Sequence, residues 1–174
     1  LDKTSSKSNI EKLNILWCTT LIYHFNKEYE VLEPVLKEIQ EYNLVFRLHP
    51  VGHISEPEIL ESLEPEILQH ASISRNRNIF DDIRTADLVV SSSSSTTFLD
   101  AILLDKKSIR VMNGTSRTNF MDERVRNLFD VSNSAQFRNA LFEDRKPENE
   151  SNPGVLDVGD IFYLRSDVWE SILN

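Results

Sequence analysis

The stretch ADLVVSSSSSTTFLDAILLDK, Ala86–Lys106, contains the pattern that decides the fold. It passes from the apolar run Leu88–Val90 through a run of serines and threonines into apolar residues at helical spacing, namely Phe98, Leu99, Ile102 and Leu103. This order predicts a buried strand, then a hydroxyl-rich loop, then a helix. The role of the hydroxyl groups depends on where the rest of the chain places this loop.

Three interpretations of the serine loop, Ser91–Thr97, are open from the residues alone. A loop between a strand and a helix leaves backbone N–H groups unpaired beside the positive end of the helix dipole, which suits an anion, and small hydroxyls add donors. Thr97 and Asp100 also fit a helix-capping pair, so the residues can serve only to start the helix. The packed elements on both sides argue against the third interpretation, a slack serine-rich linker.

Further apolar runs alternate with helical patterns along the chain. Strands are predicted at Leu13–Thr20, Asn43–Pro50, within Gln69–Asn76, at Asp87–Val90, at Ser108–Asn113 and briefly at Leu128–Val131. Apolar residues at helical spacing predict one helix, and Pro34 is tolerated there only in the first turn; these residues are Val31, Leu32, Val35, Leu36, Ile39 and Tyr42. Further helices are predicted to start at residue 55 and to lie near residues 79–86, 98–103, 121–128 and 135–141. Strands alternating with helices are typical of a parallel sheet covered on both faces. We therefore predict an α/β fold, a Rossmann-like three-layer sandwich with a mainly parallel sheet.

The length of 174 residues fits one domain, which we assign to residues 11–174 after a polar tail or linker at residues 1–10. The chain starts at Leu1 rather than at a methionine, so we expect it to be part of a longer protein. The closing segment, Gly159–Leu173, can be a strand or a helix on its pattern.

Composition excludes several classes of protein. The formal net charge of −9 argues against a nucleic-acid-binding protein, which normally has a basic face. No apolar run approaches the ~20 residues of a membrane span, and no signal peptide is evident. The single cysteine, Cys18, allows no internal disulfide, fits a reducing compartment and is predicted to be a buried hydrophobic residue rather than a nucleophile. We expect a cytoplasmic location, with the rest of the protein making any contact with the inner face of the membrane.

Polar side chains follow the predicted strands, where parallel sheets bind ligands. They are Thr19-Thr20, His49-Pro50, Ser74–Asn78, the serine loop and Asn113–Ser116. Acidic residues are scarce at these positions although the chain as a whole is acidic. Hydroxyls, amides, an imidazole and two arginines at one edge of the sheet predict a pocket for an anion.

Each of these residues also has a simpler interpretation. His49 before a proline can be a turn residue, or it can donate a hydrogen bond to a phosphate oxygen. Arg75 and Arg77 can pair with phosphate or remain solvated. We predict no metal site, because His24, His53 and His70 lack metal-ligand spacing and Asp81-Asp82 fall in the first turn of a helix, where the dipole favours carboxylates.

The combination of motifs resembles the C-terminal, donor-nucleotide half of a GT-B glycosyltransferase. The most similar members are bacterial capsule and surface-polysaccharide enzymes of the sialyltransferase-like and polysialyltransferase-like families. The matching residues are His49-Pro50 in FRLHP, the run Ser93-Ser94-Ser95-Thr96, and Asp100 one turn into the next helix. The resemblance covers roughly residues 15–141. It departs at Asp100, where many members have glutamate, and the run of five serines leaves the register of the motif open.

The resemblance implies a role for each matching residue. His49, the expected catalytic residue, and the residues Ser93, Ser94, Ser95 and Thr96 would bind the phosphate of the donor. Asp100 would bind a ribose hydroxyl, and the stretch with Arg75 and Arg77 would lie near the base. Thr19, Thr20 and Pro50 complete the predicted nucleotide site at the strand ends. No cofactor is implied, because the nucleotide-sugar is the substrate.

The resemblance also implies partners that this chain does not contain. A GT-B enzyme needs a second Rossmann-like domain, expected upstream, which binds the glycan acceptor; 174 residues leave no room for it. We therefore expect the donor-binding domain of a glycosyltransferase of surface or capsular polysaccharide synthesis, using a CMP-sugar. The alternatives are a transferase domain for CDP-glycerol or a related polyol phosphate, and a non-catalytic interaction or regulatory module of the same fold.

Overall fold

The structure, a computed structural model, describes residues 12–51, 54–112 and 127–142. The described strands are β1 Leu13–Cys18, β2 Tyr42–Arg47, β3 Ala71–Ile73, β4 Leu88–Ser92, β5 Lys107–Val111 and β6 Leu128–Val131. The described helices are α1 Ile22–Leu36, α2 Glu56–Ser62, α3 Pro65–Leu68, α4 Ile79–Thr85, α5 Thr97–Leu103 and α6 Ser134–Phe142.

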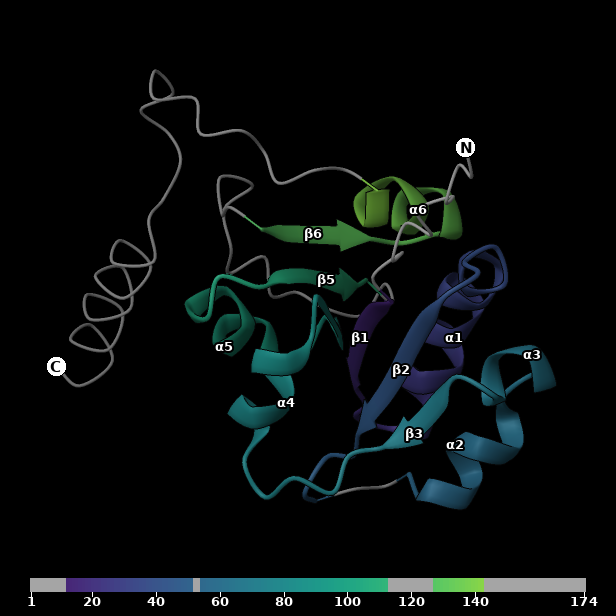
Figure 1. Cartoon of the computed structure of the whole chain (residues 1–174), viewed down its shortest axis with the longest axis horizontal. Helices are drawn as coiled ribbons and strands as arrows, with labels where there is room; N and C mark the ends of the chain where they lie inside the picture. Colours follow the sequence, from purple (N-terminus) through teal and green to yellow (C-terminus); the bar gives the residue numbers. More distant parts are fainter. Residues whose placement is uncertain (1–11, 52–53, 113–126, 143–174) are drawn as a thin grey trace, which may run out of the picture.

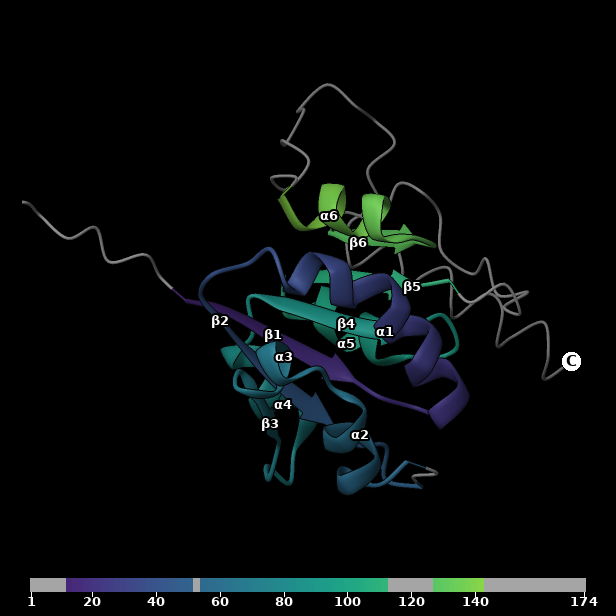
Figure 2. The ribbon, with the colours of Figure 1, turned by 90° about the vertical axis from the view of Figure 1, so that its right-hand side faces the viewer.

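The six strands form one parallel sheet in the order β3-β2-β1-β4-β5-β6. Helices α4 and α5 lie on one face of the sheet and α1 and α6 on the other, as Figures 1 and 2 show. The predicted Rossmann-like three-layer sandwich is confirmed. The strand order reverses direction between β1 and β4, because the chain first adds strands on one side of β1 and then on the other.

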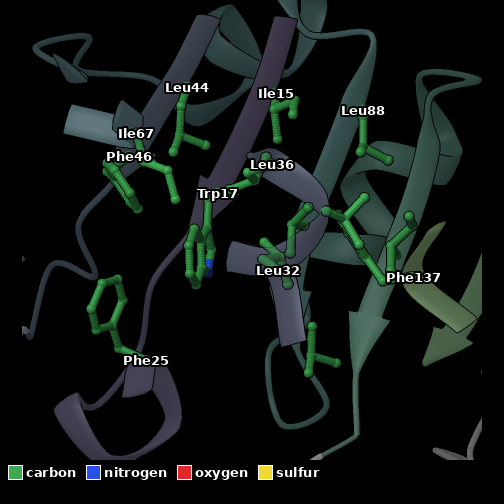
Figure 3. Packing of buried hydrophobic residues seen from close by; sticks show 14 of the residues in the cluster. Ile15, Trp17, Phe25, Leu32, Leu36, Leu44, Phe46, Ile67, Leu88 and Phe137 are labelled. Carbon is green, nitrogen blue, oxygen red and sulfur yellow. The ribbon is translucent and has the colours of Figure 1, made fainter. Parts of the chain in front are cut away.

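The larger hydrophobic core lies between the sheet and α1, α2, α3 and α6. Trp17 of β1 is fully buried there and stacks on Phe25 of α1 with ring centroids 5.1 Å apart. Figure 3 shows Trp17 pointing toward the same region as Leu32 and Leu36 of α1. Alternate residues of the strands, such as Leu16 and Val89, form a smaller core with α4 and α5. Burial on both faces accounts for the continuous apolar runs in the sequence.

The first helix differs most from the prediction. It begins at Ile22 and ends at Leu36, so the pattern reaching to Tyr42 is wrong, and Pro34 lies near its end rather than in its first turn. The helical pattern continues backward from Leu32 through Glu28 to Phe25, and all three are buried. A glutamate on the buried face concealed this first half of the helix from an analysis based on apolar spacing.

The predicted strands are confirmed with shifted bounds: β4 extends to Ser92, β6 matches the prediction, and β3 retains only Ala71–Ile73. The helix predicted near residues 121–128 falls almost wholly outside the described residues, and its last residue, Leu128, begins β6 instead. The tail at residues 1–10, Asn113–Ser116 and Gly159–Leu173 also lie outside the described residues. The helix predicted near residues 135–141 is α6.

Candidate functional site

The site follows from the strand order. In an open parallel sheet, ligands bind beyond the carboxyl ends of the two strands between which the order reverses. These strands are β1 and β4, and Cys18 pairs with Ser91 at their ends. Thr19 and Thr20 therefore follow one strand, and the serine loop follows its neighbour. The topology brings these two predicted parts of the site together.

The serine loop forms a tight turn. The Ser95 N–H donates to the Ser92 carbonyl at 3.1 Å, and the hydroxyls of Ser92 and Ser94 lie 2.8 Å apart. Ser93 is buried, Ser95 is half-buried, and Ser94 and Thr96 are exposed. Of the four predicted phosphate contacts, Ser94 and Thr96 are thus the ones most open to a ligand.

The start of α5 bears on the capping interpretation. Thr97 is the first residue of the helix and not its N-cap, so the expected capping pair of Thr97 with Asp100 does not form. Thr96 is the N-cap, and its side chain makes no capping hydrogen bond. The Ser95 hydroxyl accepts from the Thr97 N–H at 3.2 Å, and the Ser92 hydroxyl accepts from the Ser94 N–H at 3.3 Å. Asp100 lies half-buried in the first turn. Capping of α5 therefore explains only some of the hydroxyl residues in the serine loop.

The end of β1 provides a second group of donors. Thr19 is buried and uses both its N–H and its hydroxyl to bond the Arg47 carbonyl, at 3.0 and 3.2 Å. The buried Thr20 hydroxyl has no hydrogen-bond partner among the described residues. Helix α1 starts two residues later at Ile22, without a side-chain cap and without an acidic residue in its first turn. Its positive end and the unpaired Thr20 hydroxyl favour an anion at this edge.

His49 follows β2, the other neighbour of β1, and is exposed together with Pro50. The His49 Nδ1 atom accepts a hydrogen bond from the Val51 N–H at 3.2 Å. A neutral imidazole that accepts at Nδ1 carries its proton on Nε2. His49 can therefore donate from Nε2 to a phosphate oxygen, the role the sequence predicted for it.

The two predicted arginines differ in their surroundings. Arg75 donates to both carboxylate oxygens of Glu56 in α2, at 2.7 and 2.8 Å. Arg77 is exposed. Of the two, Arg77 is the side chain that the structure leaves more open to a ligand, and a contact from Arg75 would compete with its ion pair.

Two further arginines were missed by the sequence analysis. Arg47 is half-buried at the end of β2, and its guanidinium lies 2.9 Å from the carboxylate of Asp82. Arg110 in β5 is buried, donates to both carboxylate oxygens of Asp130 at 2.7 and 2.5 Å, and lies 4.6 Å from the centre of the Phe98 ring. An arginine within an apolar strand was the available signal, because charged side chains are rarely buried unless they are paired.

Cys18 behaves as predicted. It is buried at the end of β1, and burial raises the pKa of its thiol to about 12, with the nearby Asp82 carboxylate adding to the shift. A thiol with this pKa remains protonated near neutral pH and is a poor nucleophile. Its role is packing, as expected of a buried cysteine.

No three histidine, cysteine, aspartate or glutamate side chains within residues 12–51, 54–112 and 127–142 are grouped so that they could hold a metal ion. Of the helices described, none has the length and apolar character needed to cross a membrane.

Comparison with known proteins identifies the fold. No protein-family model and no curated protein matches the chain. Among solved structures, it is similar to ADP-heptose LPS heptosyltransferase II of E. coli, with a TM-score of 0.54, 14% identity and coverage of 78% of this chain and 47% of that chain. It is also similar to the glycosyltransferase SnogD from Streptomyces nogalater, with a TM-score of 0.51, 14% identity and coverage of 94% and 41%.

The chain spans less than half the length of both structures. At this sequence identity the similarity concerns the fold alone. The predicted fold class is confirmed as a fold, a Rossmann-like α/β sandwich of the kind found in one half of a GT-B structure.

Proposed function

We propose that this chain is the donor nucleotide-binding domain of a glycosyltransferase that acts in surface or capsular polysaccharide synthesis. The observation that carries the proposal is that His49, Thr20 and the loop with Ser94 and Thr96 follow three adjacent strands, β2, β1 and β4, at the point where the strand order reverses. A fold shared with half of two glycosyltransferases supports the reaction class. The name of the first, a lipopolysaccharide heptosyltransferase, supports a surface glycan as product.

In this proposal the chain binds the phosphate of the donor and stabilises it as it leaves. His49 donates a hydrogen bond from Nε2, while the exposed hydroxyls of Ser94 and Thr96 and the positive end of α1 add further donors. Donors fixed before the reaction stabilise developing negative charge without reorganising. The acceptor and a second Rossmann-like domain would come from the rest of the full-length protein. The proposed donor is a CMP-sugar.

Nucleotide titration tests the proposal. The protein is titrated with CMP, CDP, UDP, GDP and ADP by calorimetry. Preference for CMP supports the sialyl-type donor, and preference for CDP favours a polyol-phosphate transferase. No affinity for any of them would overturn the proposal and favour a non-catalytic module.

His49→Ala should weaken nucleotide binding by roughly tenfold to a hundredfold, because a hydrogen bond to a charged group contributes roughly 1.5–3 kcal/mol. His70→Ala is the matched control. His70 precedes β3 at the opposite edge of the sheet and packs on Tyr42 with ring centroids 4.3 Å apart. Equal losses of affinity in the two variants would contradict a phosphate contact by His49.

A further inference from the structure

A row of polar side chains crosses the sheet just inside the proposed nucleotide site. Cys18 of β1 pairs in register with Arg47 of β2 on one side and with Ser91 of β4 on the other. Ser91 pairs in turn with Arg110 of β5, and Arg110 with Asp130 of β6. The two arginines thus occupy equivalent positions on either side of β1 and β4.

Arg47 fixes the loop that follows β3. Its guanidinium donates to the Asp82 carboxylate at 2.9 Å, to the Arg77 carbonyl at 3.2 Å, and to the Asn76 carbonyl. Two of these three acceptors are backbone atoms of loop 74–78. A planar guanidinium directs several donors at once, which an ammonium group cannot do in the same geometry.

Asp82 of α4 holds the same loop through further hydrogen bonds. Its side chain is 4% exposed and accepts hydrogen bonds from the Ser74 hydroxyl at 2.7 Å and from the Asn76 side-chain amide at 2.6 Å. The Asn76 N–H donates in addition to the Ser74 hydroxyl at 3.2 Å. Loop 74–78 is therefore wrapped around a largely buried Arg47–Asp82 ion pair, which restricts its backbone to one conformation.

Loop 74–78 lies where a nucleoside would reach. Neighbouring strands are about 4.8 Å apart, so the end of β3 is roughly 10 Å from the end of β1, comparable to the length of a nucleoside. A phosphate held at β1 and β4 can therefore direct its base over β2 toward this loop. The exposed residues Arg77 and Asn78 carry guanidinium and amide groups of the kind that bond base edges.

We propose that Arg47 is a positioning residue: by fixing loop 74–78 it determines which nucleotide base the site accepts. This inference rests on the proposed function. Arg110 differs in this respect, since its contacts among the described residues are with Asp130 and Phe98, on the other side of the site. A change at Arg110 should alter stability. Where it also alters binding, through the serine loop, the affinities of all nucleotides should change by the same factor.

The test compares Arg47→Lys with Arg110→Lys in the full-length protein. The dissociation constants of CMP, CDP, UDP, GDP and ADP are measured by calorimetry, together with thermal unfolding. Base preference is measured as the ratio of the largest to the smallest of these dissociation constants. Arg47→Lys should reduce this ratio by roughly threefold to tenfold, the contribution of one or two hydrogen bonds. Arg110→Lys should leave that ratio within twofold. If Arg47→Lys does not fold, Asn76→Ala loosens the same loop and should reduce the ratio in the same direction.

The outcomes separate the two proposals. A wild-type protein that binds no nucleotide overturns both. A wild-type protein that binds nucleotides without base preference, or whose preference survives Arg47→Lys and Asn76→Ala, overturns the role of Arg47 and leaves the proposed function standing. Equal loss of preference in Arg110→Lys shows that general destabilisation is responsible, and also overturns it.

Discussion

Helices α2 and α5 both follow hydroxyl residues, but they use them differently. At α2, the Ser55 hydroxyl accepts from the Glu58 N–H, and the Glu58 carboxylate accepts in return from the Ser55 N–H at 2.7 Å. At α5, the Thr96 side chain makes no capping bond and is exposed. The same residue types thus stabilise the fold at one helix and remain available to a ligand at the other. Because α5 starts beside the point where the strand order reverses, and ligands bind at such points in parallel sheets, the exposed hydroxyl at α5 can take part in ligand binding.

The comparison extends to a polar group of the interior that is bonded within the fold rather than placed at a strand end. Glu28 is fully buried in the face of α1 against the sheet and accepts a hydrogen bond from the Trp17 indole N–H at 2.8 Å. Burial raises the pKa of its carboxyl group to about 8, although the hydrogen bond from Trp17 lowers it. Changes to such groups should alter stability, whereas changes at the strand ends should alter binding.

The largest expected effect is on the pH dependence of stability at Glu28. Because its pKa rises from 4.5 to about 8 on folding, the folded chain holds the proton more tightly, and stability falls as pH rises through this range. Between pH 6 and pH 8 the wild type should lose about 2 kcal/mol more than Glu28→Gln, since each pH unit contributes roughly 1.4 kcal/mol. Urea unfolding at several pH values measures this. The same pH dependence in both proteins would contradict a protonated Glu28.

The second prediction tests whether the hydroxyls of the serine loop bind a ligand or only cap α5. The double change Ser94→Ala and Thr96→Ala removes the two exposed hydroxyls. We expect nucleotide affinity to fall by at least about tenfold, because even one lost hydrogen bond to the charged phosphate costs roughly 1.5–3 kcal/mol, with unfolding free energy changed by less than about 0.5 kcal/mol. Calorimetry and urea unfolding measure the two quantities. A loss of stability with unchanged affinity would restore the capping interpretation.

The smallest effect provides the reciprocal control at α2. Ser55→Ala removes one half of a capping box and should cost about 1 kcal/mol of stability. Nucleotide affinity should not change, because the Ser55 side chain bonds only Glu58 among the described residues and takes no part in the proposed site. If Ser55→Ala weakened binding as much as the serine-loop variant, the distinction between the two helices would not hold.

Much of the fold could be predicted from the sequence, because buried parallel strands have continuous apolar runs such as Leu88–Val90. The first half of α1 could not, since Glu28 occupies a buried position where the pattern requires an apolar residue. Within the candidate site, the strand-end residues Thr20, His49 and Ser94 could be predicted because the end of a strand is visible in sequence.

Other features depended on contacts between distant residues. Arg47 and Asp82 are 35 residues apart in the chain, and no local pattern links them. Likewise, Arg75 is paired with Glu56 of α2, although Arg75 and Arg77 are both exposed. Neither relation follows from residue spacing, because both require that α2, β2, loop 74–78 and α4 be placed in space.

The sequence by itself determined the alternation of strands and helices and the polar character of the strand ends, because local periodicity and backbone preference are properties of neighbouring residues. The tertiary structure decided which strand ends are adjacent, which hydroxyls are exposed and which charges are paired. These depend on the strand order β3-β2-β1-β4-β5-β6, in which β1 and β4 become neighbours although 69 residues separate Cys18 from Leu88. Non-local pairing of this kind is set by how the whole chain packs its apolar faces, and no short stretch of sequence records it.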